Sequence, residues 1–319
     1  MADAYQDSAP APANEDAGAD LSVVIVTYNS ASALPALLDS LPTGLKGINR
    51  FEVFIVDNDS QDGSAELAEA HALGPTVIRM GRNAGYAAGI NAAAALAQPG
   101  SHLLILNPDL RLYPDAARPL LEHLAAPSVG VVVPLNYKED GSIDPTLRRE
   151  PSMLTAWADA VLGGTLAARL GWSEIVGEAN RYHRSGPVEW ASGSALLVSA
   201  KVRRAVGAWD ESFFLYSEEV EYQRRVREAG FDIVYEPRAK VMHSCGGSGT
   251  SPRLFALLTS NKIRYYGRYH GFLRTAMFRL GVAAGHATRF WQGSPHRAAL
   301  YSALMPLGPV SDFQTGKRN

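Results

Sequence analysis

Short hydrophobic segments alternate with longer amphipathic segments over residues 21–135 of the chain. The short segments are rich in β-branched residues and nearly free of polar positions, which is typical of parallel strands covered on both faces. Strands are predicted at residues 21–27, 51–57, 76–80, 102–107 and 129–134. Ala- and Leu-rich segments between them predict helices at residues 32–41, 63–73, 84–98 and 115–125. This alternation predicts βαβ units in an open α/β sheet, whose ligands bind beyond the carboxyl ends of the strands.

The pattern changes near residue 136. Residues 136–187 are polar with little periodicity, and we expect them to be irregular. Beyond them, the sequence predicts a strand with a Gly/Ser kink, a helix that ends in a glycine, and two short strands, at residues 188–199, 217–230, 231–237 and 240–244. Helical periodicity returns after residue 251.

The N-terminal residues 1–19 are rich in Ala, Pro and Asp and contain no Leu, Ile or Val. Such a segment cannot bury enough apolar surface to order itself, so we expect a disordered tail. It lacks the basic start and apolar stretch of a secretory signal. No window of about 18 uninterrupted apolar residues follows, and no transmembrane helix is expected.

Charge is distributed unevenly along the chain, although the net charge is only −2. Residues 251–319 contain 10 Lys and Arg but a single Asp, whereas the rest of the chain is acidic. A basic, aromatic-rich segment indicates contact with something anionic, such as phospholipid head groups or a lipid diphosphate. A helical cap on the body or a homodimer contact are the alternatives. We expect no nucleic-acid binding, because no recognised nucleic-acid fold accompanies the charge.

The single cysteine, Cys245, excludes a disulfide framework within the chain. It fits a reducing compartment, so we expect a cytoplasmic protein. No nucleophile pattern surrounds Cys245, which favours a plain thiol over a catalytic one.

Polar residues gather where the predicted strands end. Asp57 ends the second strand, and Asp109 follows the fourth. Because the carboxyl ends of parallel strands meet at one edge of a sheet, these carboxylates are candidates for a shared site. Asp and Asn are also good turn and helix-capping residues, and that role is favoured for Asp62 and Ser64.

A glycine-containing segment, "GRNAGYAAGIN", opens the third predicted helix with Gly85 and Gly89. Small residues at a helix N-terminus let a phosphate approach the backbone closely. The segment is not a dinucleotide-binding fingerprint, since no G-x-G-x-x-G follows the first strand.

Six segments in order resemble the family-2 inverting glycosyltransferases of the GT-A fold, and most closely the bacterial rhamnosyltransferase branch. They are "VVIVTYNS", "FIVDNDSQDGS", "GRNAGYAAGIN", "LLILNPDL", "WASGSALLVS" and "GAWDESFFLYSEEVEYQRRVREAGFDIVYEPRAKVMH". The resemblance covers residues 21–270 and implies an α/β GT-A fold, with a Rossmann-like open mixed sheet and a helical C-terminal extension. It divides the chain into a nucleotide-sugar-binding half (20–135), an acceptor-binding and catalytic half (136–250) and a basic helical segment (251–319).

The resemblance also implies residue roles on the donor side. The nucleotide would be held by residues that follow the strands and open the third helix: Thr27, Tyr28, Asn29, Asp57, Asn83, Gly85 and Asn107. Asp57 would accept a hydrogen bond from the pyrimidine N3–H. Asp109 would bind Mg²⁺ or Mn²⁺ as the last position of a D-x-D motif whose first position is Asn107, and His243 would help hold the metal or the diphosphate. An ordinary structural histidine is the alternative for His243.

On the acceptor side, the resemblance assigns the general base to Glu219, with Glu218 as a second candidate. The family most often has Asp at the Glu219 position. Four residues of the kinked strand would face the acceptor: Trp190, Ser192, Gly193 and Ser194. Trp190 could stack on a sugar ring, but core packing explains it equally well.

The function implied is transfer of a sugar, L-rhamnose from dTDP-L-rhamnose being the first choice. The acceptor would be a saccharide or lipid-linked saccharide in cell-envelope polysaccharide synthesis, with the protein peripheral at the inner face of the cell membrane. UDP-galactofuranose and UDP-GlcNAc are alternative donors, and an inactive GT-A-fold binding protein is a further alternative. A nucleotidyltransferase is disfavoured, because the segment after the first strand, "TYNSASALP", contains no Lys or Arg.

Overall fold

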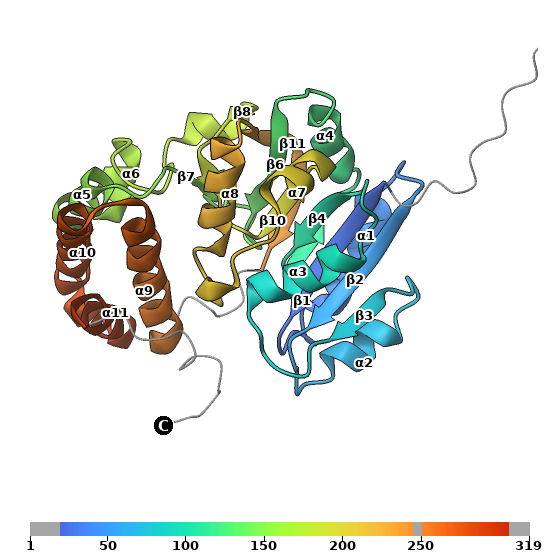
Figure 1. Cartoon of the computed structure of the whole chain (residues 1–319), viewed down its shortest axis with the longest axis horizontal. Helices are drawn as coiled ribbons and strands as arrows, with labels where there is room; N and C mark the ends of the chain where they lie inside the picture. The colour runs from blue at the N-terminus through green and yellow to red at the C-terminus, as the bar shows by residue number, and fades with distance from the viewer. Residues whose placement is uncertain (1–19, 245–250, 306–319) are drawn as a thin grey trace, which may run out of the picture.

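The computed structural model describes residues 20–244 and 251–305, and places in them one mixed sheet flanked by helices (Figure 1). The sheet order is β3-β2-β1-β4-β10-β6-β11-β5, and β8 pairs with β11. The strands of this sheet are β1 (Leu21–Thr27), β2 (Phe51–Asp57), β3 (Thr76–Arg79), β4 (His102–Leu106), β5 (Leu110–Leu112), β6 (Val129–Tyr137), β8 (Gly186–Pro187), β10 (Ala195–Val198) and β11 (Asp232–His243). The expected α/β class, with an open mixed sheet, is therefore confirmed. The expected tail, Cys245 and the last 14 residues lie outside the described residues.

The first four strands are parallel and lie where the sequence predicted them. Their helices are α1 (Leu34–Gly44), α2 (Ser64–Glu69), α3 (Tyr86–Leu96) and α4 (Ala117–His123). Buried leucines of α1 and α4 cover one face of the sheet. The other face is covered by α3, α7 (Ala200–Val206) and α8 (Glu218–Glu228). Burial on both faces explains why these strands are almost free of polar residues.

Two predicted strands differ from the observed ones. Residues 188–199 form two strands, because β9 (Trp190–Ala191) leaves the main sheet and pairs with β7 (Leu147–Arg148), while β10 runs antiparallel between β4 and β6. The two short strands expected at 231–237 and 240–244 are instead one strand, β11, with a shift in register between Glu236 and Lys240. The bulge produced by Pro237 and its neighbours made one strand look like two.

The expectation of an irregular segment at 136–187 is wrong. It contains α5 (Met153–Leu162), α6 (Gly164–Arg169) and the 3₁₀ turn η1 (Ala179–His183). A capping box starts α5, since Thr155 N–H donates to the Ser152 hydroxyl and Ser152 N–H donates to that of Thr155. The helix was missed because its buried face consists of small alanines while large apolar side chains occupy its exposed face, which hides the usual periodicity.

The C-terminal helices are α9 (Pro252–Tyr269), α10 (Phe272–Ala287) and α11 (Ser294–Leu304), with the 3₁₀ turn η4 (Phe290–Gln292) before α11. They pack with α5 and α6 at one end of the molecule, beside α8 (Figure 1). Buried Ile263, Tyr266 and Phe278 hold them together. Within the described part of the chain, none of the helices has the length and apolarity needed to cross a bilayer.

Candidate active site

The loops that follow β1 and β2 are joined by side-chain hydrogen bonds. The Thr27 hydroxyl donates to Asp57 Oδ1 over 3.0 Å, and the Ser60 amide donates to Asp57 Oδ2 over 2.9 Å. The Asn29 amide donates to the Ser60 hydroxyl, and its φ of 53° is left-handed. Asp57 is 3% exposed, and the carboxylate that was expected to accept a hydrogen bond from a pyrimidine N3–H also holds the loop after β2. Each oxygen keeps a second lone pair for a ligand.

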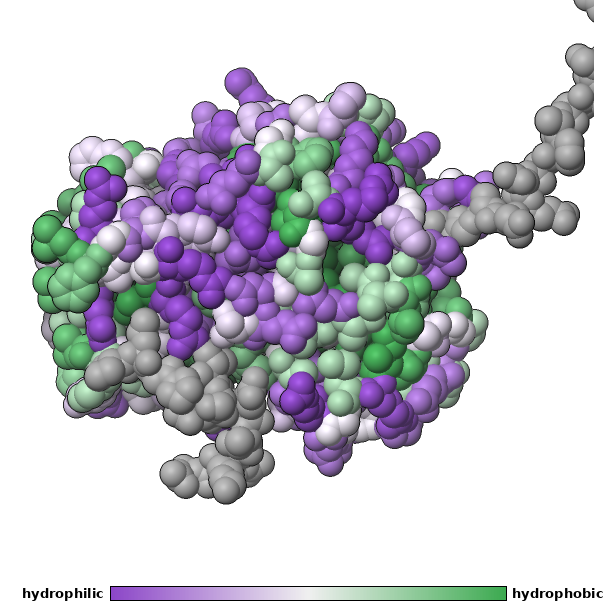
Figure 2. All heavy atoms as spheres, viewed as in Figure 1, coloured by the Kyte–Doolittle hydropathy of each residue, from purple (hydrophilic) through white to green (hydrophobic). Residues whose placement is uncertain are grey.

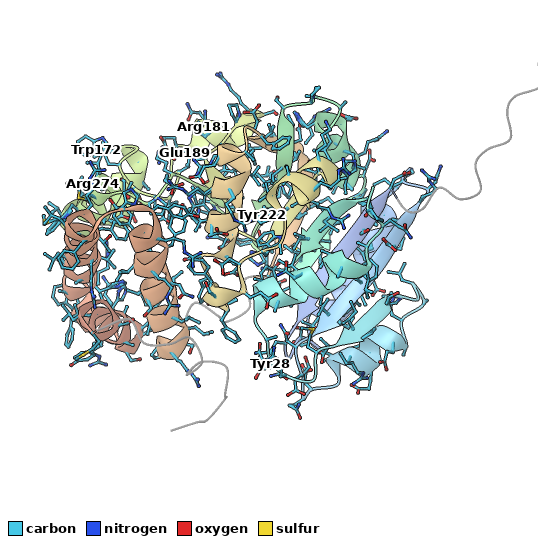
Figure 3. All side chains as sticks on the ribbon, viewed as in Figure 1. Tyr28, Trp172, Arg181, Glu189, Tyr222 and Arg274 are labelled. Carbon is cyan, nitrogen blue, oxygen red and sulfur yellow. The ribbon has the colours of Figure 1, made fainter. Side chains whose placement is uncertain are left out.

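A cavity of about 320 Å³ opens beyond the ends of β1 and β4. Five of the seven residues expected to hold the donor line it: Thr27, Tyr28, Asn83, Gly85 and Asn107. Tyr28 is 51% exposed and projects from the lower edge of the molecule, near the carboxyl end of β1 (Figure 3). This size and position suit a nucleotide at the edge of a parallel sheet.

Gly85 closes one wall of this cavity and requires a glycine for two reasons. Its φ is +95°, and a Cβ at this position would overlap the carbonyl oxygen of Phe214. The amide of Tyr86 donates to the same oxygen over 2.8 Å. The start of α3 is thereby fastened to the loop that precedes α8.

Tyr86 connects the donor side of the site with the catalytic side. Its hydroxyl donates to Asn107 Oδ1 over 2.9 Å and also lies 3.2 Å from the carbonyl oxygen of Gly193. Burial raises the pKa of this phenol, and the nearby charges of Glu218, Glu219 and Asp109 raise it further. The phenol is therefore influenced by carboxylates from two segments, the loop after β4 and the start of α8. The role of Tyr86 was missed, although the residue lies within a segment that the sequence singled out.

His243, near the end of β11, lies between two carboxylates. Its Nε2 is 3.3 Å from Asp109 Oδ1, and its Nδ1 is 3.3 Å from Asp144 Oδ2. Burial by itself lowers the pKa of His243, but the two carboxylates outweigh it and raise the pKa to about 9. The His243 hydrogen bond keeps the pKa of Asp144 below its usual range. Asp144 was not predicted, because a single Asp in a polar segment gives no signal of a partner 99 residues away.

Asp109 and His243 also suit a divalent cation. A carboxylate oxygen and an imidazole nitrogen that face one another within 3.3 Å can bind the same Mn²⁺ or Mg²⁺ after a small movement. Asp144 would then orient the imidazole through Nδ1, as carboxylates around metal sites commonly do. Among the described residues, no group of three His, Cys, Asp or Glu side chains forms a complete metal site. Most of the coordination would therefore come from the diphosphate and water.

The two candidate bases start helix α8. Glu218 is 3% exposed and Glu219 is partly exposed, and each has a buried Oε2 that no hydrogen bond reaches. Burial raises the pKa of both carboxyls, and the charge of Glu219 raises that of Glu218 further. Glu219 lies next to Gly193, where an added Cβ would be 3.4 Å from Glu219 Cβ. Of the two, Glu219 is the more exposed.

A strained loop delivers these two glutamates. Phe214, Tyr216 and Ser217 all have a positive φ, between 62° and 72°. Backbone of this kind persists only where surrounding contacts hold it, and it is concentrated at functional sites. Asn261 of α9, fully buried, holds the loop by donating from Nδ2 to the carbonyl oxygens of Phe213 and Leu215, over 2.6 and 2.9 Å.

The four residues expected to face the acceptor are placed differently from one another. Gly193 is at the site beside Tyr86 and Glu219, and Ser192 precedes it in the same short segment. Ser194 is buried and its hydroxyl accepts from Asn136 Nδ2. Trp190 is 6% exposed, its indole N–H donates to the carbonyl oxygen of Arg149, and it belongs to a buried hydrophobic cluster with Phe213 and Tyr265. Of the two interpretations of Trp190, this position favours core packing over sugar stacking.

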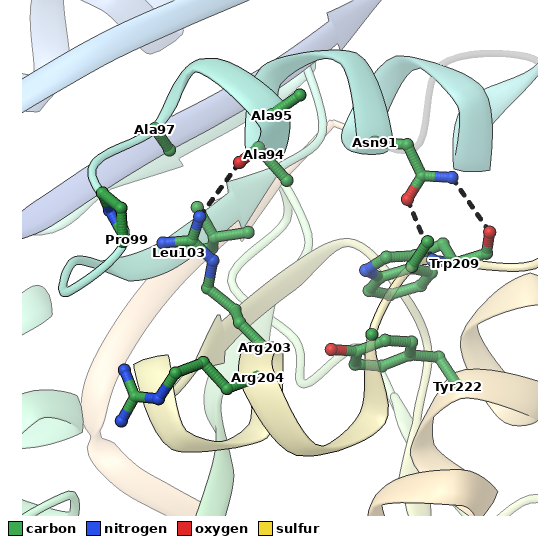
Figure 4. A pocket seen from close by; sticks show the side chains of 12 residues that line it. Asn91, Ala94, Ala95, Ala97, Pro99, Leu103, Arg203, Arg204, Trp209 and Tyr222 are labelled. Atoms are coloured by element: carbon green, nitrogen blue, oxygen red, sulfur yellow. Dashed lines mark hydrogen bonds between the residues drawn. The ribbon is translucent and has the colours of Figure 1, made fainter.

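A larger cavity, of about 430 Å³, lies elsewhere, between α3 and α7 (Figure 4). Trp209 and Tyr222 stack there with their ring centroids 4.2 Å apart, and Asn91 bonds to the backbone of Trp209. Arg203 donates to the carbonyl oxygens of Ala94 and Gln98 at the end of α3. These side chains already form hydrogen bonds to the backbone, so we assign the cavity a structural role.

A mixed sheet of this order, with a nucleotide-sized cavity beyond the ends of its parallel strands, is the GT-A fold that the sequence led us to expect. Two solved structures share the fold at low identity. GalNAc-T7 with UDP, GalNAc and Mn²⁺ matches with a TM-score of 0.60 and 16% identity, over 94% of this chain and 54% of that protein. The mannosyltransferase PcManGT from Pyrobaculum calidifontis, with GDP-Man and Mn²⁺, matches with a TM-score of 0.55 and 16% identity, over 93% and 82%.

Sequence comparison gives the family. The model of glycosyl transferase family 2 matches residues 22–182. The N-acetylglucosaminyl-diphospho-decaprenol L-rhamnosyltransferase of Mycobacterium tuberculosis is 30% identical over 273 residues, which cover 81% of this chain and 87% of that protein. The low-salt glycan biosynthesis hexosyltransferase Agl10 of Haloferax volcanii is 28% identical over 218 residues, or 67% and 64%. The chain belongs to glycosyl transferase family 2, in its rhamnosyltransferase-like branch, which confirms the resemblance.

Proposed function

We propose that the protein transfers L-rhamnose, with inversion, from dTDP-L-rhamnose to a lipid-linked saccharide in cell-envelope glycan synthesis. The rhamnosyltransferase relative, which covers most of both chains, supports this choice of donor and acceptor class. The observation that carries the reaction type is the link that Tyr86 makes between the nucleotide-sized cavity and the neighbourhood of Glu219. Tyr86 lines the cavity, and its hydroxyl contacts the carbonyl oxygen of Gly193, beside which Glu219 lies. Residues 20–135 would bind the donor and 136–250 the acceptor.

Thr27, Tyr28 and Asn83 would hold the nucleotide in the cavity, with Asp57 and Asn29 supporting the loops around it. Asp109 and His243 would hold a divalent cation, which neutralises the charge that develops on the diphosphate leaving group. His243 must release a proton to act as a ligand, so cation binding is coupled to proton release. Asp144 keeps the imidazole oriented throughout.

Glu219 would act as the general base. It takes the proton of the acceptor hydroxyl as that oxygen attacks the anomeric carbon from the face opposite the diphosphate. A raised pKa makes its carboxylate a stronger base than an exposed glutamate. Glu218, buried beside it, would be the second candidate for this role.

A binding screen tests the donor. The protein is mixed with Mn²⁺ and with dTDP, UDP or GDP, and its melting temperature is measured, since a ligand that binds only the native state raises that temperature. We expect dTDP with Mn²⁺ to give the largest rise, and dTDP-L-rhamnose to be hydrolysed slowly without an acceptor. A largest rise with UDP, together with turnover of UDP-galactofuranose or UDP-GlcNAc, would assign the other donors instead. Binding without any turnover would indicate the inactive binding protein.

A further inference from the structure

Exposed large hydrophobic side chains are concentrated at one end of the described structure. All but three of them lie in residues 153–175 or 258–305, and the three exceptions are Tyr28, Leu96 and Tyr113. Single exposed hydrophobic residues are normal on any protein surface, but such a concentration indicates a surface that binds something. Figure 2 shows hydrophobic side chains gathered at the left end of the molecule, where Figure 1 places α5 and α10.

Two helices form the centre of this surface. Each helix contributes a stripe of exposed hydrophobic side chains at helical spacing. The stripe of α5 is Leu154, Trp157 and Val161, and that of α10 is Leu273, Met277 and Leu280. The stripes adjoin, because the Trp157 indole N–H donates to the carbonyl oxygen of Met277 over 3.1 Å. We call these six residues the α5/α10 face. Val161, Leu273 and Leu154 are the most exposed of the six, at 75, 74 and 65%.

The charge around the α5/α10 face is positive. Residues 251–305 contain eight Lys and Arg and no Asp or Glu. Arg274 on α10 and Arg169 on α6 are exposed, and Arg274 and Trp172 lie at the same end of the molecule in Figure 3. The one acid of α5, Asp159, is half-buried beside Lys262 and Ser173. An apolar centre with a basic surround is the pattern of proteins that lie on anionic bilayers.

We propose that the α5/α10 face docks on the surface of an anionic lipid bilayer. Its apolar side chains would enter the boundary between head groups and acyl chains, and Arg169 and Arg274 would meet lipid phosphates. A second copy of this chain is a poorer occupant, because a two-fold contact through the same face would place its basic surround against itself. The sequence pointed only to residues 251–319; the structure adds α5 and α6 to that surface.

A further cavity lies beside α6, toward the same end of the molecule. This cavity, of about 380 Å³, is lined by Ala168 and Arg169 of α6 and by Ile143 and Pro145, which flank Asp144. We expect the saccharide of a lipid-linked acceptor to occupy this cavity while its lipid stays in the bilayer. This last step rests on the proposed function, whereas docking of the α5/α10 face does not.

Vesicle flotation of the full chain tests the docking surface. Vesicles of phosphatidylcholine alone are compared with vesicles that also contain phosphatidylglycerol. We expect the wild type to float with the anionic vesicles and to be released by salt. Val161→Glu and Leu273→Glu should each reduce the bound fraction by about tenfold or more, since each places a charge on a surface that would otherwise enter the bilayer. Arg274→Glu should weaken binding to the anionic vesicles only.

Leu96→Glu is the matched control, because Leu96 is 58% exposed on α3, away from this surface. It should bind vesicles like the wild type, and circular dichroism should show that all variants are folded. Equal binding by wild type, Val161→Glu and Leu273→Glu would overturn the proposal. So would a wild-type dimer in light scattering that Val161→Glu dissociates, because the face would then join two chains. Transfer to a water-soluble acceptor, measured separately, should be unchanged in these variants, so failure of the transfer reaction is scored apart from failure of docking.

Discussion

At the scale of single residues, the site is built from groups whose ordinary properties are altered by their neighbours. Glu218 and Glu219 are next to each other and largely out of water, and burial raises the pKa of each. Ionised carboxylates in such a position cost stability, which is common where a carboxylate serves as a base. The helix dipole at the start of α8 favours negative charge and offsets part of this cost.

This cost predicts how stability depends on pH. A carboxyl whose pKa is raised in the folded state binds its proton more tightly there than when unfolded, so stability falls as pH rises from the ordinary pKa toward the raised one. Glu218 has the more strongly raised pKa of the two carboxyls, so Glu218→Gln removes the larger part of this loss of stability. We expect a higher melting temperature than wild type at pH 7, and a smaller loss between pH 5 and pH 7. If the melting temperatures of wild type and Glu218→Gln changed equally between pH 5 and pH 7, the raised pKa of Glu218 would be contradicted.

Gly85 gives a second prediction. Alanine would be strained at a φ of +95° and would also overlap the Phe214 carbonyl. Gly81 has a φ of +66° but nothing within 4 Å of an added Cβ, so Gly81→Ala measures the backbone effect alone. We expect Gly85→Ala to lose roughly 1–3 kcal/mol of unfolding free energy in urea, and Gly81→Ala to lose less. Only Gly85→Ala should also weaken dTDP binding; equal behaviour of the two variants would exclude the clash.

At the scale of elements, α9 holds the strained loop that precedes α8. Both lie outside residues 22–182, the half of the chain that matches the family model. Asn261 holds the carbonyl oxygens of Phe213 and Leu215, and Arg268 forms an ion pair with Asp210 at the start of the same loop. The strained backbone at Phe214 and Tyr216 is thus held from α9 and, through Tyr86, from α3.

Asn261→Ala should therefore lower kcat more than it raises KM, by roughly tenfold or more, because a small displacement of a catalytic group has a large effect on rate. Ser40→Ala is the control: the Ser40 hydroxyl also bonds to backbone, at Leu37 and Leu112, but on the opposite face of the sheet from α8. We expect both variants to lose stability, measured by urea unfolding, and only Asn261→Ala to lose turnover. An equal fall in kcat for both variants would show that Asn261 affects turnover only through overall stability.

At the scale of the whole molecule, the sequence predicted the parts governed by local pattern. Strands β1 and β2 are buried on both faces, and their bounds were predicted at Leu21–Thr27 and Phe51–Asp57 as observed. Helix α5 was missed because its large side chains face outward, toward what we infer to be a lipid surface. Asp144, Tyr86 and Asn261 could not be assigned roles, because each acts on a partner distant in the sequence. The metal-binding roles of Asp109 and His243 came from family resemblance alone and stay predictions, and the structure places the two side chains 3.3 Å apart.

The most direct test of the account is the comparison of wild type with Glu219→Gln in transfer from dTDP-L-rhamnose with Mn²⁺ to a soluble saccharide acceptor. Glutamine keeps the shape of the side chain but cannot accept the proton of the acceptor hydroxyl. The account predicts that turnover falls by roughly 10²–10⁴-fold while donor binding, measured by thermal shift, is unchanged. Near-normal turnover in Glu219→Gln would contradict it.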